Sequence, residues 1–407
     1  MRRTNKDTLA AHHDFWNTQP VPQAVAEKNA RVPIGPIESK TSAEVSKEPY
    51  PLPAGLEWWT PKVSNPQELD LIYELLRDNY VEDDDCMFRF NYSIDFLKWA
   101  LGPPGYEHDW HVAVRRKADQ KLMCFISGIP ITVRMGPAPE FDAPRRICEI
   151  NFLCVHKELR SKGMAPSLIK EVTRRVNLRN VWQAIYTAGV VIPTPFSSGQ
   201  YFHRSLDPAK LIAIRFSRIP PQFEKFQKPL EMVKRHYNLP EQTACRGLRP
   251  MVPEDITVVT ELLQKYLAPF SIAASFSVDE AKHWLLPRPN VVYSYVIQNE
   301  KTQAITDFIS FYNLPSTVIG NDKYRELRAA YTFYYANFSV PLAKLMNDAL
   351  ILAKKNSFDV FNTVDILKNG EIVQELKFGP GDGKLNYYFY NWSHPSVPPS
   401  QVGLVML

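Results

Sequence analysis

A basic turn that contains a glycine, residues 160–166, has the residue types that bind phosphate. It joins an apolar run with strand character, residues 149–156, to the apolar positions of a helix. At such a helix start the N–H groups point outward with the helix dipole behind them, which suits an anion. Gly163 lets the backbone approach an oxygen closely, while Arg160 and Lys162 add positive charge. The turn therefore predicts a pyrophosphate site, with an ordinary solvated helix cap as the alternative.

The composition narrows the classes of protein to which the chain can belong. Its 407 residues are 45% hydrophobic and 12% aromatic, enough for a large core in two or three domains. A net charge of +5 is too small to indicate nucleic-acid binding, but it suits an anionic small ligand. The five cysteines lack metal-ligand spacing, so we expect reduced thiols, no metal site and a cytoplasmic location. No stretch of the sequence reaches transmembrane length.

Sequence similarity between the two halves of the chain indicates an internal repeat. The segment KWALGP (98–103) resembles HWLLP (283–287), and MCFISGIP (123–130) resembles TDFISFYNLP (306–315). In both halves these segments belong to the same predicted order of helix, hairpin, strand, helix and strand. A mostly antiparallel sheet with a strand–helix–strand crossover is an α+β pattern, which is the fold class we expect.

Three segments follow from this pattern. Residues 17–56 are rich in proline, alanine, lysine and glutamate, so we interpret residues 1–56 as an extended arm that covers a ligand. The first repeat then occupies residues 57–206 and the second residues 207–407. In the second repeat the position of the basic turn reads ANFSVPLAK (336–344), without clustered basic residues. We therefore expect only the first repeat to hold the phosphate.

Several long strings resemble, in order, the sequences of the N-myristoyltransferase family, and the basic turn resembles the acyl-CoA site of the wider GNAT acetyltransferase superfamily. The similarity extends from about residue 14 to Leu407. It implies two fused GNAT-like halves related by pseudo-twofold symmetry, with one continuous, largely antiparallel twisted sheet flanked by helices. It also implies transfer of a C14 chain from myristoyl-CoA to the N-terminal glycine of a protein. The strings are FWNTQPVP (15–22), NYVEDDDCMFRFNYS (79–93), EINFLCVHKELRSKGMAP (149–166), IYTAGV (185–190), YFHRSL (201–206), FGPGDGKLNYYFYNW (378–392) and VGLVML (402–407).

The resemblance implies that the N-terminal half binds myristoyl-CoA as an acyl-donor co-substrate and that no prosthetic group is used. The commonest family pattern has a basic residue where this chain has Gly163, so one side-chain contact to a phosphate is expected to be missing. The positions matched to acyl-CoA contacts are Asp14, Phe15 and Trp16 on the arm, Phe152, Leu153, Cys154 and Val155 on the strand, and Ser161, Lys162, Gly163, Met164, Ala165 and Pro166 in the turn.

Direct attack of an amine on a thioester needs an oxyanion site and a base. By resemblance, the N–H groups of Phe152 and Leu153 form the oxyanion hole, which a bulged strand would aim at one oxygen. Asn151 and Thr187 would steady the glycine amine. A base is needed because a peptide ammonium with a pKa of about 7.7–8.0 must lose a proton before it attacks, and the resemblance implies that this base is the terminal carboxylate of Leu407. The apolar tail would bury this carboxylate and raise its pKa; the alternative is a closing strand with a frayed, exposed end.

The acceptor peptide is expected to bind mainly through the C-terminal half. The acidic run at residues 81–85 would border the peptide groove and attract basic substrate residues, although such a run is usually a solvated loop. His203 and Ser316 would receive the serine or threonine of a Gly-x-x-x-Ser/Thr substrate. The matched contact positions are Tyr80, Val81, Asp83, Phe88, Phe90, Tyr92, His203, Tyr312, Ser316, Tyr331, Asp382, Gly383 and Leu385.

Two other residue pairs are weaker candidates for a metal site or a catalytic nucleophile. His108 and His111 have a loose metal-like spacing without a third ligand, and Cys154 with His156 lacks an orienting acid for a thiol nucleophile. We therefore expect a monomeric acyltransferase that acts on N-terminal glycine peptides and nascent proteins, without nucleic-acid partners. The alternative hypotheses are a GNAT-type N-acyltransferase with a shorter acyl donor and a non-catalytic module that binds acyl-CoA or peptide.

Overall fold

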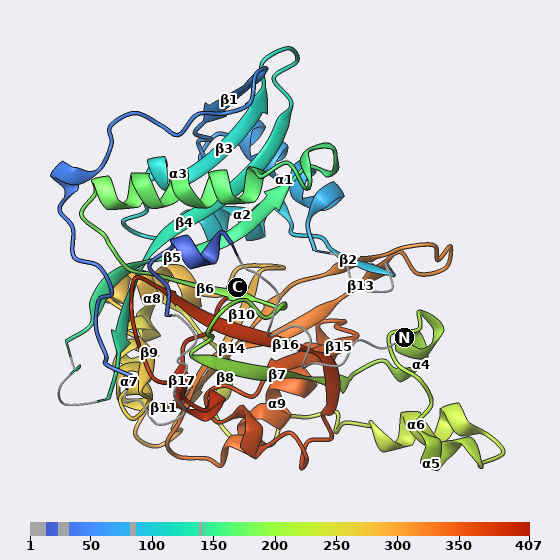
Figure 1. Ribbon diagram of the computed structural model, residues 1–407. Coiled ribbons are helices and arrows are strands. Elements are labelled where there is room, and N and C mark those ends of the chain that lie inside the picture. The colour runs from blue at the N-terminus through green and yellow to red at the C-terminus, as the bar shows by residue number, and fades with distance from the viewer. Residues whose placement is uncertain (1–13, 23–31, 82–86, 138–140, 142) are drawn as a thin grey trace.

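The computed structural model describes residues 14–22, 32–81, 87–137, 141 and 143–407, and its centre is one strongly twisted sheet (Figure 1). Within these residues the sheet has 14 strands. A smaller sheet contains β13 (Glu326–Leu327), β12 (Ser316–Val318) and β2 (Phe88–Phe90). The order of the main sheet is β1 (Leu56–Trp59), β3 (His111–Arg116), β4 (Leu122–Met135), β5 (Arg145–Val155), β6 (Ala184–Ala188), β16 (Gly379–Tyr390), β7 (Ser197–Ser205), β15 (Val360–Val364), β14 (Ala329–Asn337), β11 (Ile305–Asn313), β10 (Val292–Gln298) and β8 (Leu248–Pro250), with β9 (Ile272–Ala274) beside β4 and β17 (Val402–Gly403) beside β9.

Most neighbouring strands of the main sheet run antiparallel, as the sequence predicts. The pairs β5–β6, β14–β15 and β9–β17 are parallel. The first two are joined by the helices α3 (Met164–Leu178) and α9 (Leu342–Lys355), because a chain needs a crossover connection to return in the same direction. The expected α+β class is confirmed.

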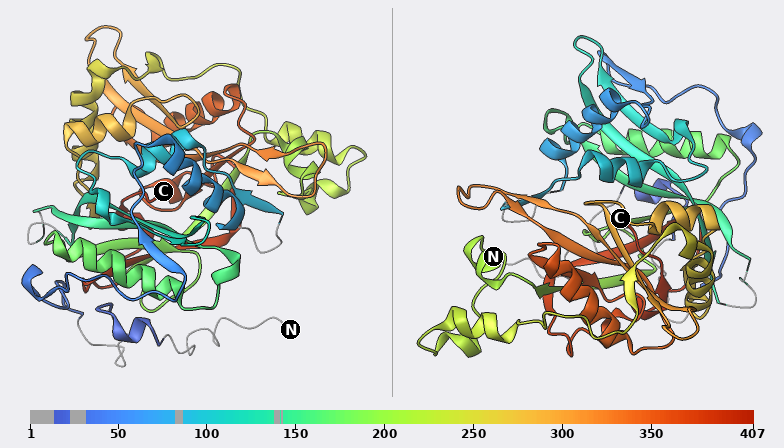
Figure 2. Two further views of the ribbon diagram at one scale, coloured as in Figure 1. Left: turned by 90° about the horizontal axis from the view of Figure 1, so that it is seen from above. Right: turned by 180° about the vertical axis from the view of Figure 1, so that it is seen from behind.

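Helices cover both faces of the sheet (Figures 1 and 2). In the N-terminal half, α3 packs on a core that includes Val112 and Leu168, while α1 (Pro66–Asn79) and α2 (Ile94–Leu101) belong to the larger core on the other face. Alternation within β3 sends Val112 to one core and Ala113 to the other. The remaining α-helices of the described chain are α4 (Pro208–Ala213), α5 (Pro221–Glu224), α6 (Pro229–His236), α7 (Ile256–Leu267) and α8 (Val278–Leu285).

The two halves share one order of elements, which confirms the predicted repeat. The series α1, α2, β3, β4, β5, α3, β6 corresponds to α7, α8, β10, β11, β14, α9, β15. The repeated tryptophans meet between the halves: Trp99 and Trp284 contact edge-on with ring centroids 5.1 Å apart. Trp99 also donates to the His283 carbonyl at 3.1 Å, and the His283 ring lies 2.7 Å from the Trp99 carbonyl oxygen.

The centre of the sheet is formed by an exchange of strands between the halves. β16, from the end of the chain, pairs with β6, whereas β7 pairs with β15 and β16. β7 therefore belongs to residues 57–206 by sequence but lies among strands of the C-terminal half. The chain's last residues return to this centre, and the C-terminus lies between the two halves in every view (Figures 1 and 2).

The second half also contains a strand–turn–helix, but a carboxylate already accepts from the N–H groups of the turn before α9. Asp307 on β11 is fully buried, and its Oδ1 accepts from the N–H groups of Phe338 at 2.8 Å, Ser339 at 3.0 Å and Val340 at 3.3 Å. In the first repeat the corresponding residue is Cys124. An internal carboxylate thus already accepts from the N–H groups of this turn, which are therefore not free to bind a phosphate.

Asp307→Ala is expected to lower the free energy of unfolding by about 2–4 kcal/mol, because three N–H groups lose their common acceptor, the buried Asp307 side chain. Asp307→Asn, which keeps a neutral oxygen at the same place, should lose clearly less. Urea denaturation of both variants measures the difference. An alanine variant as stable as the unmodified chain would show that other groups satisfy this helix start.

Candidate active site

An apolar cavity of about 270 Å³ lies between α3 and the strands β5 and β6. β5 and β6 are paired at Cys148–Ala184 and Glu149–Ile185, and the cavity opens where this pairing ends. A lining this apolar suits an acyl chain better than a polar ligand. The lining residues are Trp16, Tyr80, Ile126, Cys148, Ile150, Asn151, Phe152, Leu153, Ile169, Val172, Thr173, Val176, Asn177, Trp182, Gln183, Ala184, Tyr186, Thr187, Ala188, Val190, Ile192 and Tyr390.

The polar end of the cavity lies at a bulge in β5. The register between β4 and β5 shifts between Phe125 and Ser127, so Phe152 and Leu153 lie opposite a single residue of β4. Phe152 has a φ of 53°, a left-handed conformation that is uncommon for an aromatic residue. A bulge interrupts the ladder and changes the direction of its backbone groups. The Phe152 N–H donates to Asn151 Oδ1 at 2.8 Å.

The last residue of the chain reaches this bulge. Asn151 Nδ2 donates to a carboxylate oxygen of Leu407 at 2.6 Å. One amide therefore contacts the terminal carboxylate through its nitrogen and the Phe152 N–H through its oxygen. Thr187, on the next strand, lines the same cavity. The structure thus brings together the residues that the resemblance assigns to the reaction: Asn151, Phe152, Leu153, Thr187 and Leu407.

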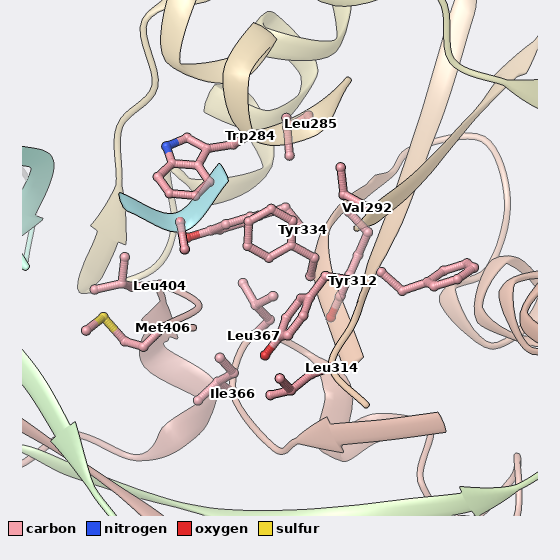
Figure 3. Packing of buried hydrophobic residues seen from close by; sticks show 14 of the residues in the cluster. Trp284, Leu285, Val292, Tyr312, Leu314, Tyr334, Ile366, Leu367, Leu404 and Met406 are labelled. Atoms are coloured by element: carbon pink, nitrogen blue, oxygen red, sulfur yellow. The ribbon is translucent and has the colours of Figure 1, made fainter. Parts of the chain in front are cut away.

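The tail that carries Leu407 is fixed inside the molecule. β17 pairs with β9, and the Val405 N–H donates to the Tyr334 hydroxyl at 3.0 Å. Leu404 and Met406 are buried beside Trp284, Tyr334, Ile366 and Leu367, as Figure 3 shows. The alternative of a frayed, exposed end is therefore wrong: burial of these side chains and the two backbone contacts hold the tail in place.

The basic turn forms the start of α3, as predicted. Ser161 and Gly163 have φ values of 61° and 73°, and Gly163 caps the helix without a side-chain hydrogen bond. Pro166 lies in the first helical turn, where a missing N–H costs no intrahelical bond. A Cβ at Gly163 would meet nothing within 4 Å, so the space next to the helix start is open.

Arg160 differs from the expectation for this turn. Its guanidinium donates to the carbonyl of Asn79 at 2.6 Å and to that of Val155 at 3.4 Å. Part of its hydrogen-bonding capacity therefore fastens the turn to α1 and β5. This leaves Lys162 and the backbone as the more accessible donors for an anion.

The arm contributes an aromatic side chain, that of Trp16, to the cavity. Trp16 lines it and stacks on Tyr186 with ring centroids 5.6 Å apart, and Phe15 contacts Trp16 edge-on at 5.1 Å. The Asn391 N–H donates to the Pro20 carbonyl at 2.7 Å and holds this segment against the sheet.

Three of the positions matched to acyl-CoA contacts lie elsewhere. Asp14 is exposed at the start of the described arm. Neither Cys154 nor Val155 is among the described residues that line the cavity. Cys154 is buried toward α1, with Sγ 3.9 Å from the Leu75 carbonyl oxygen. The bulge explains this, because it reverses the alternation of side chains beyond Phe152.

Several peptide-contact positions meet in an aromatic cluster beside the cavity. The Tyr92 ring lies 5.1 Å from Phe152, 5.8 Å from Tyr80 and 5.9 Å from Phe90. Tyr80 and Phe152 also line the cavity, so the cluster and the cavity share a wall. A ligand bound against the cluster would therefore lie next to the bulge.

The C-terminal half adds a second group of predicted residues. Tyr312 and Tyr331 stack at 5.3 Å. His203 Nδ1 lies 2.7 Å from Asn362 Oδ1, and burial lowers the pKa of His203, so its imidazole is neutral at pH 7. Ser316 is buried in the small sheet opposite Phe90.

The remaining predicted positions are more dispersed. Asp382 and Gly383 lie on β16 where its register with β7 is interrupted, and the Gln200 side chain donates to the Gly383 carbonyl at 3.0 Å, whereas Leu385 pairs with Gly199 of β7. Val81 is exposed, and Phe88 contacts Phe216 edge-on at 5.7 Å, which in turn contacts His203. Asp83 lies outside the described residues.

Sequence reasoning missed part of the lining. The α3 stripe of Ile169, Val172 and Val176 has the spacing of one helix face, but an ordinary core helix has the same pattern. Tyr186 also lines the cavity. It lies beside Thr187 in the matched string IYTAGV, but it was not named as a candidate site residue. Tyr201 lies close enough to Tyr92, Tyr312 and Tyr331 to contribute to their raised pKa values, and its spacing from His203 places both on one face of β7.

Neither a metal centre nor a membrane span was found in the described ranges of the chain. Across them no cluster of three or more His, Cys, Asp or Glu side chains could hold an ion. The helices in the same ranges are too short or too polar to cross a bilayer. Cys124, Cys148, Cys154 and Cys245 are free thiols.

Comparisons with known proteins agree with this geometry. Residues 36–199 match the family model of the myristoyl-CoA:protein N-myristoyltransferase N-terminal domain, and residues 213–405 match that of the C-terminal domain. The chain is 48% identical over 400 residues to glycylpeptide N-tetradecanoyltransferase 1 of Arabidopsis thaliana, covering 98% of this chain and 90% of that protein. It is 47% identical over 403 residues to glycylpeptide N-tetradecanoyltransferase 2 of Danio rerio, covering 99% of this chain and 79% of that protein.

A solved structure has the same fold over almost the whole length. The crystal structure of Saccharomyces cerevisiae N-myristoyltransferase with bound myristoyl-CoA superposes with a TM-score of 0.90 at 39% identity, covering 98% of this chain and 100% of that one. The N-terminal and C-terminal family domains, the full-length relatives and this structure all point to one assignment. The chain belongs to the myristoyl-CoA:protein N-myristoyltransferase family, whose members are acyltransferases.

Proposed function

We propose that the protein transfers myristate from myristoyl-CoA to the N-terminal glycine amine of acceptor proteins. The observation that carries this proposal is the position of the Leu407 carboxylate, which is hydrogen-bonded to Asn151 at the polar end of the apolar cavity. A cavity of this kind accommodates an acyl chain, and a carboxylate at its polar end is a suitable proton acceptor for an amine. The family's name for its donor, myristoyl-CoA, agrees with both features.

The acyl donor would lie along α3, with its CoA phosphates at the basic turn. The N–H groups at the helix start and Lys162 would hold the phosphates, with Ser161, Gly163, Met164, Ala165 and Pro166 forming the turn. Phe15 and Trp16 would close the cavity from the arm. Residues 57–206 would thus bind the donor, and residues 207–407 would supply most contacts to the peptide.

Attack would take place at the β5 bulge. The Leu407 carboxylate would remove a proton from the glycine ammonium, while Asn151 and Thr187 hold the amine. The neutral amine would then attack the thioester carbonyl, whose developing negative charge the N–H groups of Phe152 and Leu153 stabilise. The Phe152 N–H now donates to Asn151 Oδ1. The thioester oxygen must therefore displace this amide oxygen or accept a hydrogen bond from the same N–H.

The acceptor peptide would extend from the reaction site across the aromatic cluster. Tyr80, Phe90 and Tyr92 border its first residues, and the neutral His203 with Ser316 would receive a serine or threonine hydroxyl. The other proposed contacts are Val81, Asp83, Phe88, Tyr312, Tyr331, Asp382, Gly383 and Leu385.

Mass spectrometry of a Gly-x-x-x-Ser peptide incubated with the protein and acyl-CoAs of graded chain length tests this function. We expect attachment of the C14 chain to the N-terminal amine, and none to a peptide whose amine is acetylated beforehand. A preference for acetyl- or octanoyl-CoA would favour the alternative of a shorter donor. Binding of myristoyl-CoA and peptide without any product would favour a non-catalytic module.

The open space at Gly163 allows a test of the phosphate site. We expect Gly163→Arg to bind myristoyl-CoA about fivefold more tightly than Gly163→Gln, because a partly screened ion pair to a phosphate contributes about 1 kcal/mol. Both side chains have the same left-handed backbone cost at a φ of 73°, so their difference isolates the charge. Calorimetry in low and high salt measures it, and the difference should shrink as salt screens the pair. Equal affinities at low salt would place the phosphates away from residue 163.

A further inference from the structure

A buried acidic side chain next to the proposed reaction centre has no partner. Glu149 lies on β5 two residues before Asn151, and it is 7% exposed. Throughout the described residues its carboxyl has neither a hydrogen bond nor an ion pair. β4 and β6 flank it on both sides, through Ile129 and Ile185. A buried carboxyl without a cation is costly, so its presence calls for a chemical reason.

Glu149 lines a second cavity, of about 40 Å³, together with Leu407. The Leu407 carboxylate also contacts Asn151, which lines the acyl cavity. The last residue therefore lies between the two cavities. At its other end the second cavity is lined by Ser275 and Glu280, which are half-buried at the start of α8. Most of its lining is apolar, but Glu149, Ser275, Glu280 and Tyr334 supply polar groups, and a space of this size holds about two or three water molecules.

The proposed reaction must release one proton from this interior. The acceptor enters as an ammonium, the N–C bond forms, and the C–S bond of the thioester breaks. Of the two protons that the nitrogen loses, one ends on the sulfur of CoA and the other must reach solvent. The Leu407 carboxylate that accepts the second proton belongs to a half-buried residue that lines the second cavity, so a further acceptor in that cavity would free it to act again.

We propose that Glu149 relays this proton from the terminal carboxylate, through water in the second cavity, to solvent at the start of α8. The inference rests on the proposed function. A protonated carboxyl has one O–H donor and one carbonyl acceptor, so Glu149 receives a proton on one oxygen and releases another from the second. No net charge then accumulates in the core.

The surroundings of Glu149 fit a group that exchanges a proton near neutrality. Burial raises the pKa of Glu149 to about 8. The titratable groups that face it are the Leu407 carboxylate, Glu280 at the far end of the cavity, and the hydroxyls of Tyr334 and Tyr387. Burial also raises the pKa values of both tyrosines, so they stay neutral. The Tyr387 hydroxyl is buried and has no partner in the structure, which leaves it available to a water molecule.

Rapid-mixing kinetics of Glu149→Gln with myristoyl-CoA and a Gly-x-x-x-Ser peptide test the relay. Glutamine has the shape of the neutral carboxyl, so the fold and the affinity for myristoyl-CoA should be retained. The first turnover should keep its rate within about twofold, because the terminal carboxylate starts deprotonated. Later turnovers should be about 10–100-fold slower, and this slow phase should slow further in D₂O, because it waits for proton release.

Glu149→Asp is the matched variant, since it keeps a carboxyl in the same cavity, and it should recover most of the steady-state rate. Unchanged later turnovers in Glu149→Gln would overturn the relay. A first turnover slowed as much as the later ones would also overturn it, because that result indicates a structural role. Absence of product with the unmodified protein would instead reject the proposed function itself.

Discussion

Deletion of Leu407 is expected to lower kcat about 10²–10⁴-fold while the affinity for myristoyl-CoA stays nearly unchanged. In the structure the terminal carboxylate accepts a 2.6 Å hydrogen bond from Asn151. Without Leu407 the carboxylate would belong to Met406 and would withdraw by about 3.3 Å, the rise of one strand residue, beyond hydrogen-bond reach. The apolar cavity between α3, β5 and β6 should be unaffected, because Leu407 is not among the described residues that line it.

The sharper control keeps the side chain and removes only the charge. A semisynthetic protein that ends in Leu407 carboxamide retains every apolar contact of the tail, but it cannot accept a proton. It should be as inactive as the deletion variant in steady-state assays, with unchanged myristoyl-CoA binding by calorimetry. Turnover of the amide protein at the unmodified rate would assign the base to another group.

Leu153→Pro is expected to lower kcat about 10²–10³-fold, the usual loss when one oxyanion donor is removed. Proline lacks the N–H that the proposed oxyanion hole uses, and a bulge is a position in a strand that tolerates proline. The Leu153 side chain is 36% exposed, so little core packing is lost. Peptide and acyl-CoA affinities should change much less than kcat, because the donor acts on charge that develops in the transition state.

Leu153→Ala is the matched control, since it shortens the same side chain but keeps the N–H. Its kcat should stay within about threefold of the unmodified value, as expected for a half-exposed side chain without a chemical role. Circular dichroism and myristoyl-CoA binding establish that both variants are folded. If proline and alanine variants turn over equally fast, the Leu153 N–H takes no part in stabilising the oxyanion.

Features that depend on neighbouring residues were predictable from the sequence. The basic turn before α3 follows from a glycine, a proline in the first helical turn and the apolar spacing beyond them. The repeat was visible because each half keeps the same order of periodicities, and the pairing of Trp99 with Trp284 confirms it. The resemblance then named candidate residues on β5 and β6, including Asn151 and Thr187, which line one cavity in the structure.

Features that depend on distant parts of the chain were decided only by tertiary packing. Asn151 and Leu407 are 256 residues apart, and no local preference brings an apolar tail to that strand. Burial of Leu404 and Met406 in a core built by both halves does so. The contacts of Arg160 with the Asn79 carbonyl and of Asp307 with the turn before α9 have the same origin, because both join segments that only the packing of the chain brings together. The sequence by itself thus determined the elements and the family, whereas the tertiary structure alone decided which groups meet at the proposed reaction centre.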